Sequence, residues 1–142
     1  MELARILFVT HGLAGAVMMG VIWIVQLVHY PAFHYIAESE FKHFEQFHAQ
    51  GITRFVAPVM LVELIASTWL AGMAPDYWGN WVNAGLVIAT WAITFFVSVP
   101  LHGALADGKN AAVIDRLIAT NWWRTAIWTG KCAFTGILLL AL

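Results

Sequence analysis

The sequence predicts an all-α integral membrane protein built as a bundle of four membrane-spanning helices. Of its 142 residues, 61% are hydrophobic and 11% are charged, whereas soluble domains have about 45–50% apolar and about 25% charged residues. A chain this small has too little interior to hide so many apolar side chains from water. Its four apolar runs are long enough for helices, and strand-type alternation is absent. We expect one domain over residues 1–142.

The four predicted spans cover residues of about 6–28, 55–73, 81–101 and 123–142. The first has 23 residues, enough to cross the roughly 30 Å hydrocarbon core at about 1.5 Å per residue. It runs on into polar residues without a cleavage site, so we expect a retained helix rather than a signal peptide. The short turn after the second span makes the second and third spans antiparallel neighbours.

The two longer connections, near residues 30–54 and 102–122, contain amphipathic segments. In the first, Ala37, Phe41, Phe44 and His48 recur at helical spacing. This pattern predicts an interfacial helix that lies on the bundle or packs under it. Residues 107–121 show a similar pattern and predict a second interfacial segment.

The basic residues predict the orientation of the bundle. The side with the long connections carries five of them, and the opposite side carries only Arg5. The five are Lys42, Arg54, Lys109, Arg116 and Arg124. The positive-inside rule then places the long connections in the cytoplasm and both termini outside. Trp78 and Trp81 are expected to anchor the outer interface, and Trp122 and Trp123 the inner one.

Two charged residues interrupt the spans. Glu63 follows Phe55 by eight residues and Lys131 follows Trp123 by eight, so both lie about 12 Å inside the cytoplasmic edge. A charge in the hydrocarbon costs roughly 2.5–3.5 kcal/mol on insertion scales, which makes both residues functional candidates. Opposite charges at one depth predict an ion pair. Such a pair either fixes the register of two helices or is catalytic, with Glu63 handling protons beside Lys131.

Three histidines fall near one level of the predicted bundle. His29 and His102 close the cytoplasmic ends of the first and third spans, and His48 lies just before the second. Glu45 precedes His48 by three residues, and this spacing puts both side chains on one helix face, as in di-iron bundles. Imidazoles are common ligands of zinc, iron and copper. His29, His48, His102 and Glu45 therefore form a predicted metal site, although the wet headgroup region explains each histidine taken alone.

His11 lies in the first span, about 27 Å along the helix from His29, so these two cannot share a site. It is either a hydrogen-bonded core residue or an axial ligand of heme b, with His102 as the alternative axial ligand. A heme would show a Soret band, whereas a zinc or di-metal site would not.

The exits of the first and third spans resemble each other. Val28-His29-Tyr30-Pro31 ends the first, and Val99-Pro100-Leu101-His102 ends the third. An internal repeat of this kind places a ligand site between the two halves of the bundle.

Several local patterns resemble small four-helix bacterial membrane families. They are His11 with the His29-Tyr30-Pro31 exit, the Phe44-Glu45 pair, Pro58 and the Asn121-Trp122-Trp123-Arg124-Thr125 entry to the last span. The layout is similar to that of the anthrone-oxygenase-like proteins, a domain of unknown function. More distantly it resembles the heme-binding membrane protoporphyrinogen oxidases and the copper-resistance membrane domains. These resemblances imply a bacterial inner membrane and, from the second group, His11 as a heme or metal ligand.

Two classes of function follow. The first is a membrane protein that binds a metal ion or heme and acts as an oxidoreductase, with a quinone or another hydrophobic molecule as partner. The second is a non-enzymatic carrier or assembly factor whose histidines are structural. Self-association stays open in both. Nucleic acid is excluded as a partner because the formal net charge of −1 leaves no basic face.

Overall fold

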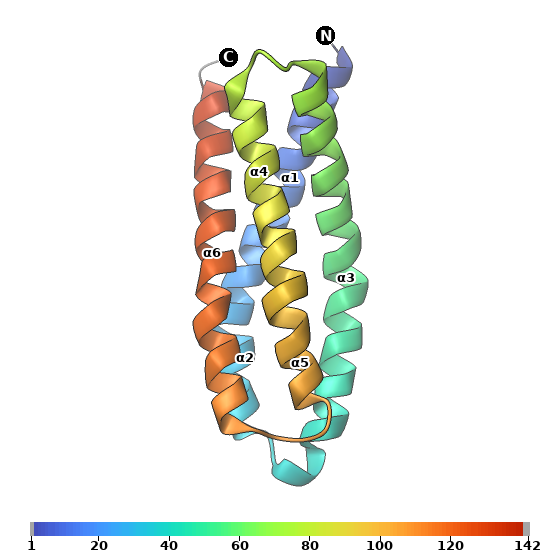
Figure 1. Cartoon of the computed structure of the whole chain (residues 1–142), viewed down its shortest axis with the longest axis vertical. Coiled ribbons are helices and arrows are strands. Elements are labelled where there is room, and N and C mark those ends of the chain that lie inside the picture. Colours follow the sequence, from blue (N-terminus) through green and yellow to red (C-terminus); the bar gives the residue numbers. More distant parts are fainter. Residues whose placement is uncertain (1, 141–142) are drawn as a thin grey trace.

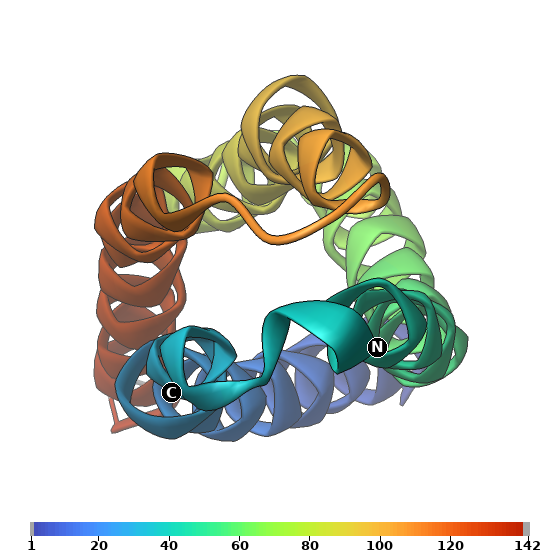
Figure 2. The same cartoon turned by 90° about the horizontal axis from the view of Figure 1, so that it is seen from below.

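The structure, a computed structural model, describes residues 2–140 and is helical throughout apart from short connections. Four long helical stretches run alternately down and up (Figure 1), and seen from below they form a closed ring (Figure 2). Both ends of the chain lie at the upper end of the bundle, beside the connection between α3 and α4. The other two connections close the lower end. The predicted all-α bundle of four helices is confirmed.

The descending stretches are segmented, and the ascending ones are continuous. The first stretch consists of α1 (Glu2–Ile24), a π-helical turn η1 (Val25–His29), α2 (Tyr30–Ala32) and a 3₁₀ turn η2 (Phe33–Tyr35). The second is α3 (Glu38–Met73). The third consists of α4 (Trp78–Ile93), a second π-helical turn η3 (Thr94–Ser98) and α5 (Val99–Leu105), and the fourth is α6 (Ala111–Leu140).

The prediction of interfacial segments in long loops is wrong. Residues 38–54 belong to α3, and residues 111–121 form the first turns of α6. The amphipathic pattern is present, but its apolar face packs inside the bundle: Phe41 and Leu117 are buried in one cluster. Since helix-compatible residues join each segment to the following span, the helix continues without a break. Residues 141 and 142 of the predicted fourth span lie outside the described residues.

A tight turn connects α5 to α6 at the lower end. Gly108 adopts φ +153°, a conformation that favours glycine because it has no side chain. The Lys109 ammonium donates hydrogen bonds of 2.7 Å to the carbonyl oxygens of His34 and Ile36. These bonds tie the α5–α6 turn to the connection before α3.

Both π-helical turns precede a proline at the same spacing. Pro31 and Pro100 lack an amide hydrogen, and their rings would collide with the carbonyl four residues earlier in a regular helix. Those carbonyls belong to Leu27 and Phe96, the central residues of η1 and η3. The wider π turn accommodates each proline without ending the helix. The predicted likeness of the two exits therefore extends to their backbone.

Three of the helical stretches in the described part of the chain are long and apolar enough to cross a membrane: Glu2–Tyr35, Glu38–Met73 and Trp78–Leu105. The fourth, α6, has 30 residues and carries Arg124 and Lys131 within its apolar half. Both charged side chains are buried in the bundle rather than exposed. Composition alone therefore understates how apolar the outer face of α6 is.

Along most of the bundle the charged side chains lie inside, and the outer face is apolar. Across residues 6–37, 55–75, 77–106 and 117–140 the only charged side chains are Glu63, Arg124 and Lys131, and all three are buried. Large apolar residues cover the outer face of the same segments, among them Leu13, Val17, Ile24, Leu61, Val62, Ile65, Ile88, Phe95 and Phe96. Such a distribution suits a hydrocarbon solvent rather than water.

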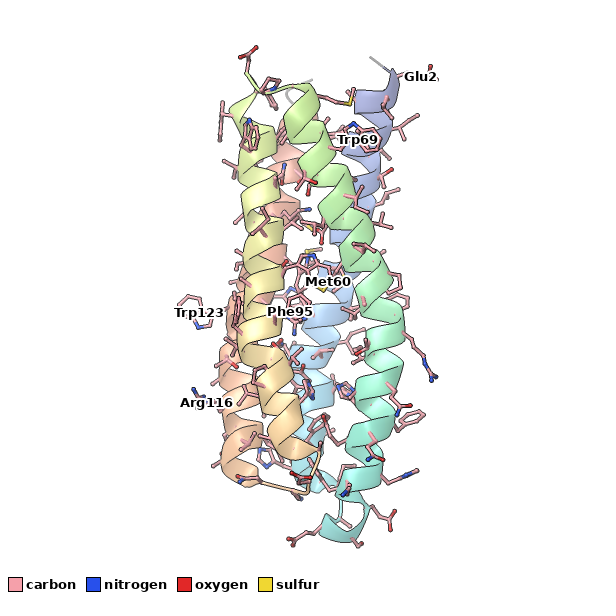
Figure 3. All side chains as sticks on the ribbon, turned by 45° about the vertical axis from the view of Figure 1, so that its right-hand side comes forward. Glu2, Met60, Trp69, Phe95, Arg116 and Trp123 are labelled. Carbon is pink, nitrogen blue, oxygen red and sulfur yellow. The ribbon has the colours of Figure 1, made fainter. Side chains whose placement is uncertain are left out.

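Exposed tryptophans lie at two levels of the bundle. Trp69 lies near the upper end, whereas Trp123 projects from the middle of α6 (Figure 3). Trp78 and Trp81 are in the first turn of α4, at the upper end, and Trp122 precedes Trp123 in α6. Leu138 packs beside Gly79, next to Trp78. Since Trp123 and Leu138 are 15 residues apart in α6, the two tryptophan levels are separated by about 22 Å. Aromatic side chains at two such levels are typical of the two interfaces of a bilayer.

Candidate functional site

The predicted histidine cluster forms in the lower half of the bundle. His29 comes from η1, His48 from α3 and His102 from α5. His29 Nε2 lies 2.6 Å from His48 Nδ1, and the rings of His48 and His102 lie 5.4 Å apart. The prediction that these three residues share one level is confirmed.

Glu45 binds His102 rather than its neighbour His48. The Glu45 Oε1 atom lies 2.6 Å from His102 Nδ1, and the Tyr30 hydroxyl lies 3.0 Å from His102 Nε2. Both ring nitrogens of His102 are therefore engaged, and Tyr30 and Glu45 fix its orientation. Tyr30 is nearly completely buried. The sequence patterns did not single out Tyr30, although its position next to His29 and Pro31 placed it at the same level.

Two polar atoms of this cluster are buried without a hydrogen-bond partner, His48 Nε2 and Glu45 Oε2. An unsatisfied buried polar atom is costly, so each is an available position for a ligand. Within residues 2–140, however, no three His, Cys, Asp or Glu side chains are arranged so that they could hold a metal ion as they stand. The cluster is assembled, but metal binding stays a prediction.

The predicted ion pair is confirmed. Lys131 Nζ lies 2.8 Å from Glu63 Oε1, and both side chains are enclosed by protein. The indole nitrogen of Trp128 donates a hydrogen bond of 3.1 Å to Glu63 Oε2. Gly15 in α1 leaves the space for the pair, because a Cβ there would lie 2.7 Å from Lys131 Nζ. These contacts explain how the pair joins α3, α6 and α1, and they leave its predicted catalytic role a prediction.

His11 lies beside this ion pair, away from the other histidines. It is fully buried, and Lys131 Nζ lies 3.5 Å from its backbone oxygen. The Phe8 ring packs edge-on against its imidazole at 5.3 Å. Neither ring nitrogen has a hydrogen-bond partner among the described residues. A porphyrin at His11 would have to displace these neighbours.

A third polar layer, between the other two, was not predicted. Asn121 Nδ2 donates a hydrogen bond of 2.9 Å to Gln26 Oε1, and Arg124 lies next to it, one turn further along α6. Arg124 was counted among the basic residues of the cytoplasmic side, at the start of the fourth span, but it is only 6% exposed. Its signal in the sequence was the stripe of residues 121, 124, 128 and 131, which places Arg124 on the same helix face as Lys131.

Three hollows surround the histidine cluster. A groove of about 350 Å³ between α1 and α3 is bordered by His29, His48 and apolar side chains such as Phe44 and Phe55. A second groove, of about 380 Å³ between α3 and α5, is bordered by Glu45 and His102. Between them an inner cavity of about 90 Å³ reaches Tyr30, His102 and Arg124. The cluster is therefore reachable from the side of the bundle.

Comparisons of the chain with protein-family models, with curated proteins and with solved structures each found no match. The resemblances drawn from individual residues therefore stay predictions, and the function has to be argued from the geometry above.

Proposed function

We propose that the chain crosses a bacterial inner membrane with all four helical stretches and keeps its lower end in the cytoplasm. The apolar outer face and the two tryptophan levels support the crossing. The surface of the lower end carries Lys42, Arg54, Lys109 and Arg116, whereas the upper end carries Arg5. From Arg54 down to Glu38 the exposed side of α3 is polar apart from Phe47, so about 24 Å of this helix extends beyond the hydrocarbon.

This orientation is tested by labelling single cysteines in a Cys132→Ala background. Asp76→Cys lies at the upper end and Asp107→Cys at the lower end, and both positions lie in connections between helices. A membrane-impermeant maleimide applied to intact cells is expected to label position 76 and to reach position 107 only after lysis. Labelling of position 107 from outside would show that the orientation is reversed.

We infer that the cluster of His29, His48, His102 and Glu45 is a site for one metal ion, with iron or copper giving the protein a redox function. The observation that carries this inference is the convergence of three imidazoles and one carboxylate from three helical stretches, with two buried atoms unpartnered. When His48 donates its Nδ1 proton to His29, the Nε2 lone pair of His48 is free for a metal. Metal binding would break either the His29–His48 or the Glu45–His102 hydrogen bond. Without metal, these two hydrogen bonds occupy the ligand atoms.

A single metal ion fits this cluster better than heme. A porphyrin at His11 would have to displace the residues that enclose it, whereas a single metal ion at the cluster needs only one hydrogen bond of His102 to open. Imidazole and carboxylate donors suit zinc, iron and copper alike, so the donor set does not choose among them.

Metal content tests the proposal directly. Protein purified without a histidine tag, loaded with zinc, iron or copper and dialysed, is expected to keep about one ion per chain. His48→Ala should weaken retention by more than about tenfold. His43→Ala is the matched control, because this histidine is on the same helix but exposed.

Equal retention by both variants, or no metal in the native protein, would contradict the proposal. It would favour the second function, a carrier or assembly factor in which the 2.6 Å contact between His29 and His48 is a structural hydrogen bond. An absorbance spectrum of the same sample tests heme, which gives a Soret band.

A further inference from the structure

Arg124 is a buried cation whose neighbours are neutral. Its Nη1 atom lies 3.4 Å from Ser98 Oγ and 3.3 Å from Asn121 Oδ1, and its guanidinium lies 5.3 Å from the centre of the Trp128 ring. Its Nε atom is buried without a partner. Among the described residues no carboxylate lies within ion-pair distance of it.

The two buried carboxylates are bound elsewhere. Glu63 pairs with Lys131, and Glu45 Oε1 is held by His102. A buried guanidinium without an anionic partner is strongly destabilising. The protein therefore holds a positive site that lacks its direct counter-charge.

Space for a counter-ion lies beside Arg124. The guanidinium borders the inner cavity of about 90 Å³, together with Tyr30, Ser98 and His102. This volume suits a carboxylate or a few water molecules. Hydrogen bonds from a guanidinium to a carboxylate are among the strongest in proteins, since both partners are charged.

The inner cavity adjoins the apolar groove between α1 and α3. Val21, Val25 and Ile52 border both spaces. The groove is lined almost wholly by apolar atoms and faces the side of the bundle. Its upper part lies at the level where the outer face of the helices is apolar, so a molecule could enter it from the lipid.

We propose that the protein binds a single-chain amphiphile with an anionic headgroup, of the fatty-acid class. Its carboxylate pairs with Arg124 in the inner cavity, and its hydrocarbon tail occupies the groove between α1 and α3. Charge complementarity selects this occupant over a neutral lipid, and the apolar groove selects it over a small free anion. The site does not depend on a metal at the histidine cluster.

Binding of radiolabelled oleate to delipidated protein in a neutral maltoside detergent, with a chelator present, tests the proposal. About one oleate per chain is expected. Oleyl alcohol, which keeps the tail without the charge, and acetate, which keeps the charge without the tail, should compete at least about tenfold more weakly.

Two variants separate the roles of charge and fold. Arg124→Gln should weaken oleate binding by at least about tenfold, and Arg124→Lys, which keeps the charge, by less. Arg116→Gln is the matched control, because this arginine is exposed on the same helix.

The variant Gly51→Leu tests the role of the groove, because Gly51 borders it and has open space around it. The leucine side chain would narrow the groove, so it should weaken the binding of oleate and leave the binding of acetate unchanged.

Four outcomes would overturn the proposal, and the first three are no oleate binding, equal binding of oleate and oleyl alcohol, and equal binding by the native protein and Arg124→Gln. Displacement of oleate by acetate at similar concentrations would also overturn it and show a site for free anions instead. Because the chelator removes metal throughout, none of these results bears on the metal site.

Discussion

Replacing Glu63 by Gln alone is expected to destabilise the protein by about 3–5 kcal/mol, because it leaves a buried ammonium without its counter-charge. Lys131 is fully buried, and among residues 2–140 its one further polar contact is a carbonyl oxygen at 3.5 Å. The free energy of unfolding, measured by denaturant titration in mixed micelles, gives the change. The expected order is native protein, then the double variant Glu63→Gln with Lys131→Met, then Glu63→Gln.

The double variant is the decisive comparison, because replacing both charges removes the pair without leaving one of them alone. Glu40→Gln serves as the control: its side chain is exposed, and the change should alter stability by less than about 0.5 kcal/mol. Additive losses in the Glu63 and Lys131 single variants would show that the two charges do not stabilise each other.

Gly15→Ala is expected to destabilise the protein by about 1–3 kcal/mol, although alanine is the better helix former. The added Cβ would lie 2.7 Å from Lys131 Nζ and 2.9 Å from Glu63 Oε1. Both atoms are the ends of side chains, but they are bound to each other and enclosed by protein, so the added methyl group would force the ion pair to shift. Thermal unfolding in detergent measures the effect.

Gly20→Ala is the matched control on the same helix. Nothing lies within 4 Å of its added Cβ, so this change should be neutral or stabilising by up to about 1 kcal/mol. If both variants unfold at the same temperature, the ion pair has more freedom than its contacts indicate. Adding Gly15→Ala to the double variant Glu63→Gln with Lys131→Met tests whether the loss arises from the charged pair.

The number of helices could be predicted from the sequence because lipid-facing segments need long apolar runs. The pairing of Glu63 with Lys131 could be predicted because helix rise alone fixes their depth. The loops were predicted wrongly for a related reason. Hydropathy reports where a helix leaves the hydrocarbon, not where it ends, and α3 continues for about 17 residues below Phe55.

The candidate site was predicted in part. His29, His48 and His102 were placed at one level because each lies at the end of a span. Which atoms meet depends on helix rotation, and rotation is set by packing. The sequence therefore did not reveal that Glu45 turns to His102, or that the guanidinium of Arg124 points inward.

The two π-helical turns determine in which direction around the helix axis the following side chains point. A π turn holds one residue more than an α turn, and one residue corresponds to about 100° of rotation in an α-helix. Without η1 and η3, the helix segments beyond them would be rotated by that angle, and Tyr30 and His102 would no longer face each other. A one-residue deletion in either turn would place Pro31 or Pro100 in a regular helical turn and rotate the segment below it, so it would dismantle the histidine cluster. The arrangement of side chains at the lower end of the bundle therefore depends on the one additional residue in each π turn, not on the loops.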